Sequence, residues 1–159
     1  MATIFAEEFA ELNRASDGAL SIAAMREGES EILRRAGFEA AAERSHRASK
    51  ASYDLHAHAR KCVAAHLRVE GALTEAADAA AATAAGSQTH VALGAGLRPA
   101  KLAVDDALAA HRDVRRVLHE AAAVAQEAFD EANIEEGSGE ESALFDAYAA
   151  VLDLEGAQL

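Results

Sequence analysis

Apolar and small residues recur along most of the chain at alternating steps of three and four, the spacing that lines up side chains on one face of an α-helix. The pattern is strictest over residues 38–83, where it holds for more than six heptads. We call this row of positions a seam, because it corresponds to the a and d positions of a coiled coil. A seam of this length predicts a long helix packed against a second helix. Its residues are Phe38, Ala41, Ser45, Ala48, Ser52, Leu55, Ala59, Cys62, His66, Val69, Leu73, Ala76, Ala80 and Thr83.

Glycine and proline divide the chain into separate helices. The breaks fall at Gly37, at residues 86–99 and at residues 135–141. Pro99 is expected in the first turn of the third helix, where a missing N–H costs nothing. The predicted helices cover about residues 2–36, 38–85, 98–135 and 140–155. The third carries its own seam, formed by Ala100, Val104, Ala107, His111, Val114, Leu118, Ala121, Ala125, Ala128 or Phe129, and Ala132.

The fold expected from these patterns is all-α, because no stretch shows sustained alternation or a cluster of β-branched residues. We expect an elongated antiparallel helical bundle, with three long helices and a short C-terminal helix in a single domain of residues 1–159. Gly18 and Gly28 weaken the first helix. Helices two and three are expected to form a hairpin around a loop near residue 91, so the numbers of facing residues should sum to about 183.

Much of the hydrophobic content is alanine, so it overstates the large apolar side chains available for a core. Hydrophobic residues make up 51% of the chain, but 44 of the 159 residues are alanine, aromatics are 4% and there is no tryptophan. Alanine specifies helix well and loses no side-chain entropy, yet it buries little apolar area. Such a bundle is expected to need either close approach of its helices or a second copy of itself.

The charge of the chain is strongly negative and unevenly placed. The net charge of −12 argues against nucleic acid as a partner, because phosphate binding needs a basic face. Residues 117–159 hold eleven acids and no Lys or Arg, whereas residues 34–70 hold eight basic and four acidic residues. Two interpretations follow. The two regions neutralise each other within the fold, with Arg44, Arg47 and Lys50 beside the acidic end of helix three, or the acidic end docks a basic partner.

The single cysteine and the N-terminal residues give expectations about the cellular compartment of the protein. One cysteine excludes an internal disulfide and is typical of a reducing compartment. The segment MATIFAEEFAELN lacks the pattern of a Sec-type signal, and no apolar run reaches the ~18 residues of a membrane-spanning helix. We therefore expect a cytoplasmic protein that does not bind membranes. The use of alanine and arginine is typical of a bacterial genome rich in GC.

Potential metal ligands recur every four residues in the second helix, at Asp54, His58, Cys62, His66 and Glu70. Because this row drifts around the helix, one ion cannot reach all five, but His58, Cys62 and His66 span about 80°. The expected hairpin register brings His119 or Leu118 near His66, so His119 is the candidate fourth ligand. A transition metal or a haem is the cofactor that such a site would take. The alternative is structural, because Cys62 and His66 already occupy seam positions.

Patterns that identify an enzyme are missing. A ferritin-like di-iron site needs Glu-x-x-His on two helices, but Glu43-x-x-His46 occurs once and lies beside the seam. No G-x-S-x-G motif is present. The sequence therefore favours a non-enzymatic module for protein–protein interaction or assembly, whose partner is itself or another helical or basic protein. A bundle that binds a metal or cofactor through His58, Cys62, His66 and His119 is the alternative.

Overall fold

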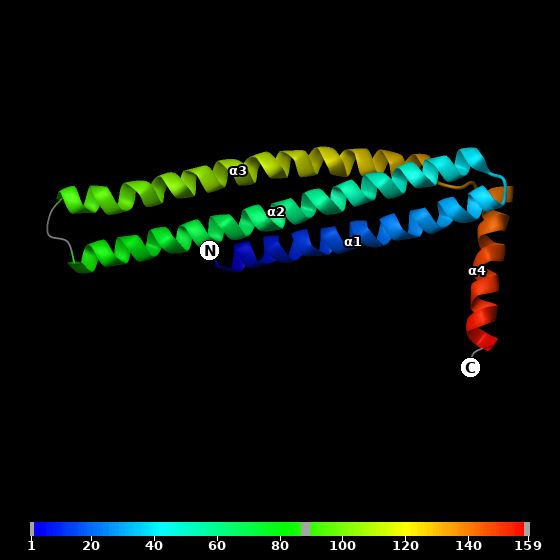
Figure 1. Cartoon of the computed structure of the whole chain (residues 1–159), viewed down its shortest axis with the longest axis horizontal. Coiled ribbons are helices and arrows are strands. Elements are labelled where there is room, and N and C mark those ends of the chain that lie inside the picture. The colour runs from blue at the N-terminus through cyan, green and yellow to red at the C-terminus, as the bar shows by residue number, and fades with distance from the viewer. Residues whose placement is uncertain (1, 87–89, 158–159) are drawn as a thin grey trace. The chain divides into compact units, whose positions relative to one another are not determined.

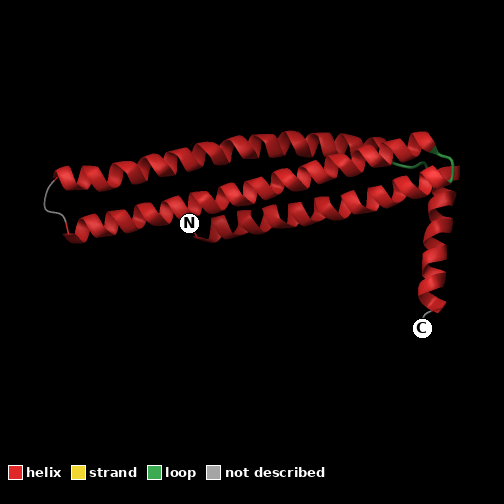
Figure 2. Cartoon of the chain, viewed as in Figure 1, coloured by secondary structure: helices red, strands yellow, loops and turns green. Residues whose placement is uncertain are grey.

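The protein is an all-α helical bundle (Figures 1 and 2). The computed structural model describes the backbone of residues 2–86 and 90–157 and the side chains of residues 6–84 and 97–156. These residues form four helices and no strand, as expected. The helices are α1 (Ala2–Arg35), α2 (Glu39–Gly86), α3 (His90–Glu131) and α4 (Gly139–Ala157).

The start of α3 differs most from the prediction. The helix begins at His90 rather than near residue 98, so Gly94, Gly96 and Pro99 lie inside it. Glycine and proline disfavour a helix interior, but such local preferences are weak and tertiary context routinely overrides them. The expectation that Pro99 lies in the first turn was therefore wrong.

The other helix ends lie close to the expected ones. Helix α1 ends at Arg35 and continues through Gly18 and Gly28. Helix α3 ends at Glu131 instead of residue 135. Its last turn tightens there, since the Ala132 N–H donates to the carbonyls of both Ala128 and Phe129, at 3.1 and 3.2 Å.

The helices form two compact units. Unit 1 consists of Met1–Arg14 and His58–His119, and unit 2 consists of Ala15–Ala57 and Glu120–Leu159. In each unit a part of α1 packs against a part of α2, and a part of α2 against a part of α3. The expectation of a single domain stays a prediction.

The pairing of α2 with α3 is shifted from the expected register. In unit 1 Cys62 contacts Val114, and His66 lies beside His111. The numbers of these facing residues sum to 176 and 177 instead of about 183. The shift follows from the position of the loop. Because α2 continues to Gly86 and α3 begins at His90, the midpoint between the two helix ends is residue 88, three positions before the expected loop centre at residue 91.

Unit 2 has a small hydrophobic core where α1 turns into α2. Leu33, Ala41, Ala42 and Leu144 are buried there, with Ile32, Phe38 and Ile134 packed around them. The turn itself depends on Gly37, whose φ of 89° is a conformation that side chains with a Cβ disfavour. Leu144 attaches the first half of α4 to this core.

Small residues line the contact between α1 and α2 in unit 2. Ser30 Oγ donates to the Ala42 carbonyl and Ser49 Oγ donates to the Ala23 carbonyl, both at 2.8 Å. A serine at the contact lets two backbones approach closely enough for such bonds across the helices. The antiparallel pairing of α1 with α2 is therefore set by serine hydroxyls as well as by apolar contact.

Buried Arg26 joins α1 to the end of α3 in unit 2. Its side chain pairs with Glu29 at 2.8 Å and lies 4.2 Å from the ring centroid of Phe129. Its guanidinium also donates to the carbonyls of Ala132 and Phe129, at 3.4 and 3.5 Å. A cation is favourable here, because the last carbonyls of a helix lack partners within it.

Basic and acidic side chains lie side by side in unit 2, as predicted if the two charged regions neutralise each other within the fold. Arg47 pairs with Glu131 at 4.0 Å. Arg44 lines a polar depression of about 310 Å³ together with Glu131, Glu135 and Glu140. The basic part of α2 thus faces the acidic end of α3 within one unit.

Candidate functional site

The predicted ligands on α2 divide into a buried pair and its more exposed neighbours. Cys62 and His66 are fully buried in unit 1, His58 and Glu70 are half-buried, and Asp54 is exposed. This follows from the seam, since Cys62 and His66 occupy its positions and the others flank them. His56 is half-buried too, and its Nδ1 lies 2.9 Å from the Ser16 carbonyl in unit 2.

Cys62 has a structural environment. Its thiol donates to the Val114 carbonyl of α3 at 3.4 Å. Burial raises the pKa of this thiol above its ordinary value, and nearby Arg115 opposes the shift only in part. A nucleophilic cysteine needs the opposite shift, so Cys62 packs α2 against α3 and is not activated as a thiolate.

His66 is in contact with all three helices of unit 1. Its ring centroid lies 5.9 Å from that of Phe9 on α1 and 5.9 Å from that of His111 on α3. Its Nε2 atom lies 3.4 Å from a carboxylate oxygen of Glu70. The aromatic contacts and this polar contact hold the imidazole between the helices.

His111 is the residue of this cluster that the sequence did not link to His66. Burial lowers its pKa below the ordinary value, and Arg115 and His66 lower it further while Glu8 raises it. Its Nε2 atom is buried without a hydrogen-bond partner among the described residues. The sequence did place His111 on the seam of helix three. Pairing it with His66, however, required the register between α2 and α3.

His119, predicted as a fourth ligand, lies two helical turns beyond His111 on α3, and its side chain is exposed. The structure therefore places His111, not His119, beside His66. Within the described side chains, no three His, Cys, Asp or Glu residues converge as a metal ion would require. The cluster therefore supports packing between the helices of unit 1, with the rings of His66 and His111 side by side.

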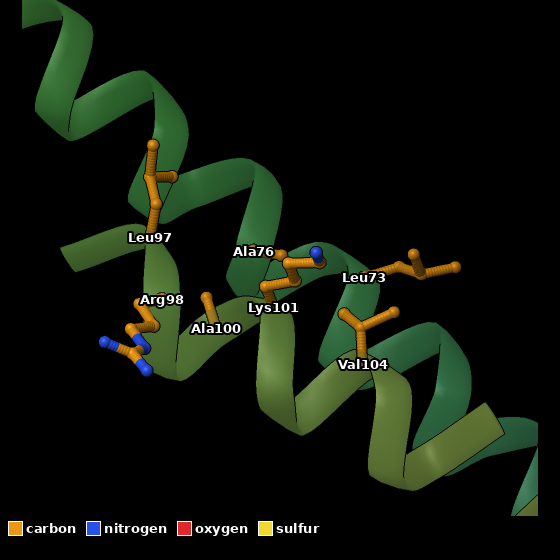
Figure 3. Close-up of a pocket in the computed structure, with 7 residues that line it drawn as sticks. All are labelled: Leu73, Ala76, Leu97, Arg98, Ala100, Lys101 and Val104. Atoms are coloured by element: carbon orange, nitrogen blue, oxygen red, sulfur yellow. The ribbon is translucent and has the colours of Figure 1, made fainter. Parts of the chain in front are cut away.

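An apolar groove runs between α2 and α3 in unit 1 (Figure 3). Its volume is about 640 Å³. Helix α3 presents Leu97, Ala100 and Val104, at the spacing of one helix face, and α2 contributes Leu73 and Ala76. Arg98 and Lys101 also line the groove from α3 and are the two charged residues among the described residues of its lining.

Helix α4 in unit 2 carries large apolar side chains that its own unit covers only in part. Leu144 is buried in the core. Beyond it, Phe145 and Leu152 are 67% and 66% exposed, and Tyr148 is 47% exposed. These three residues follow an i, i+3, i+7 spacing, so they form one stripe along the helix.

Comparisons with known proteins identify no relative of this chain. No protein-family model matches the chain. Comparisons with curated proteins and with solved structures find no match either.

Among the described residues, no helix combines the length and the apolar character needed to cross a membrane.

Proposed function

We propose that the protein is a non-enzymatic assembly module that associates with copies of itself. The observation that carries this proposal is the distribution of apolar side chains between the interior and the surface. In the described part of the chain, ten of the fifteen buried hydrophobic residues are alanine. Large hydrophobic side chains are exposed instead, at Leu20, Ile22, Met25, Tyr53, Leu67, Leu73, Leu102, Leu108, Val124, Phe145, Tyr148, Val151, Leu152 and Leu154.

The free energy of burying large apolar side chains favours association. Fully burying a large apolar side chain stabilises by about 1.5–3 kcal/mol, whereas alanine contributes far less. An exposed leucine by itself is ordinary, but clustered apolar side chains on a surface mark a site of interaction. A core made mainly of alanine and serine leaves much of the available apolar area for contacts with another molecule.

A native mass spectrum of the untagged protein, together with light scattering over a range of concentrations, tests the proposal. We expect a species of more than one chain at the mass of the polypeptide alone. A single chain at all concentrations up to about 100 μM would overturn the proposal, since at that concentration even micromolar association populates the complex. A stoichiometric extra mass that His66→Ala removes would favour the metal- or cofactor-binding alternative.

A further inference from the structure

Two apolar surfaces stay exposed within their own units, the α2–α3 groove and the stripe on α4. The charged residues beside the two surfaces have opposite sign. The groove between α2 and α3 is lined by Arg98 and Lys101. Helix α4 carries five acids, Glu140, Glu141, Asp146, Asp153 and Glu155, and no basic residue. An apolar groove with a positive edge and an exposed apolar helix with negative charge are complementary.

We propose that α4 of one copy docks into the α2–α3 groove of a second copy. This inference rests on the proposed self-association and names the two surfaces that meet. The apolar stripe of α4 packs on the groove residues of α2 and α3, and the exposed acids beyond the core, Asp146, Asp153 and Glu155, face Arg98 and Lys101.

The two surfaces match in length as well as in character. Phe145, Tyr148 and Leu152 span eight residues of α4, and the seven steps from first to last rise by about 10 Å. Leu97, Ala100 and Val104 repeat the same i, i+3, i+7 spacing on α3. A helix laid between two others in this way restores three-helix packing and follows the known binding of an amphipathic helix in a groove.

Pairing of like surfaces is disfavoured by charge. Two α4 helices brought together would place acids against acids, and two grooves would place Arg98 and Lys101 against the same residues of the other copy. Like charges across an interface cost free energy. The contact therefore joins two different surfaces, and such a head-to-tail interface forms rings where the rotation closes and open chains where it does not.

A complementation experiment tests the two surfaces separately. One variant, R98E/K101E, removes the positive edge of the groove. The other, F145S/L152S, removes the apolar stripe of α4. All four side chains are exposed, so both variants should retain the parent's helicity by circular dichroism. If R98E/K101E lost helicity, R98Q/K101Q would carry the same test.

We expect the parent to form complexes and each variant alone to be a single chain, with affinity lowered at least 10-fold. A 1:1 mixture should form a dimer and nothing larger, because one intact groove meets one intact α4. The matched controls are R112E, an exposed arginine elsewhere on α3, and V124S, an exposed apolar residue of α3. Both should associate like the parent.

Each contrary outcome has a distinct meaning. A parent that stays a single chain would overturn the proposed function and this inference together. A parent complex that both variants form unchanged would overturn the inference alone. Variants that are single chains and do not combine on mixing would also overturn it, because α4 and the groove would then not be the two halves of one contact.

Discussion

The serines buried between α1 and α2 differ in what their hydroxyl groups do. Ser30 and Ser49 each donate to a carbonyl of the facing helix at 2.8 Å. Ser45 is equally buried, yet its hydroxyl has no partner among the described residues. A buried hydroxyl contributes when it is bonded and costs free energy when it is not, so the three positions are not equivalent despite their common chemistry.

Alanine at Ser49 and at Ser45 should therefore have different effects. We expect Ser49→Ala to lower the free energy of unfolding by about 0.5–1.5 kcal/mol, because the bond to Ala23 is lost. Ser45→Ala should leave it unchanged or raise it slightly, since no bond within the described part is removed. Urea denaturation of the two variants measures the difference. Equal losses would show that the hydroxyl of Ser45 is bonded in solution.

The lowered pKa of His111 predicts that the stability of the protein depends on pH. Because burial lowers the pKa of folded His111 below its ordinary 6.5, the unfolded chain takes up a proton at a higher pH than the folded one does. The free energy of unfolding should then decrease as the pH falls below about 6.5, and this decrease should end below the folded pKa.

Urea denaturation between pH 8 and pH 5 tests this dependence. His111→Gln should reduce its slope, because the glutamine does not titrate. His119→Gln replaces an exposed histidine of the same helix and serves as the control, so its slope should equal that of the parent. A slope unaffected by His111→Gln would contradict the assignment of this effect to His111.

At the scale of the elements, the glycines have two different roles. Gly18 and Gly28 lie inside α1, where a Cβ would meet nothing within 4 Å. Gly37 and Gly137 have φ values of 89° and 77° in the turns after α1 and before α4. Glycine weakens a helix interior but permits a positive φ, so the same residue type is a cost in α1 and a requirement in the turns.

Substitution by alanine separates the two roles. Gly28→Ala should raise the free energy of unfolding by about 0.5–1 kcal/mol, because alanine loses less entropy on entering a helix. Gly37→Ala should lower it by about 1 kcal/mol or more, since alanine disfavours a φ of 89°. Thermal denaturation monitored by circular dichroism gives both signs. A gain in stability at Gly37 would mean that the turn adopts another conformation in solution.

At the scale of the whole molecule, stability and assembly should depend on different positions of one seam. Leu55 is a half-buried seam residue of unit 2. Leu73 is a seam residue of unit 1 that lines the groove and is 37% exposed. A residue packed within its own unit supports folding, whereas a groove residue remains available to another copy.

Aspartate at these two positions should therefore have separable effects. We expect Leu55→Asp to lower the free energy of unfolding by about 1–3 kcal/mol, because a charge enters a partly buried contact. Leu73→Asp should retain the parent's helical content and reduce association. Circular dichroism and light scattering measure the two properties on the same samples. If neither variant changed either property, the assignment of the seam would be wrong.

Periodicity alone was enough for the all-α fold, because the 3.6-residue repeat of apolar positions is a local property of the chain. It was also enough to place Cys62, His66 and His111 on seams. The helix ends were less predictable, since the conformational preferences of glycine and proline are weak and α3 runs through Gly94, Gly96 and Pro99. The partner of His66 was then misplaced, because a shift of the loop by three residues moves the facing residue by about six.

The sequence by itself determined the helices, the seam positions and the separation of charge, all of which depend on residue type and spacing along the chain. Tertiary structure alone decided which residues face each other. It placed His111 beside His66, turned Arg26 toward the end of α3, and left the α4 stripe and the groove uncovered. The physical reason is that burial and pairing depend on the register between helices, and register is set by loops and packing over long distances in sequence.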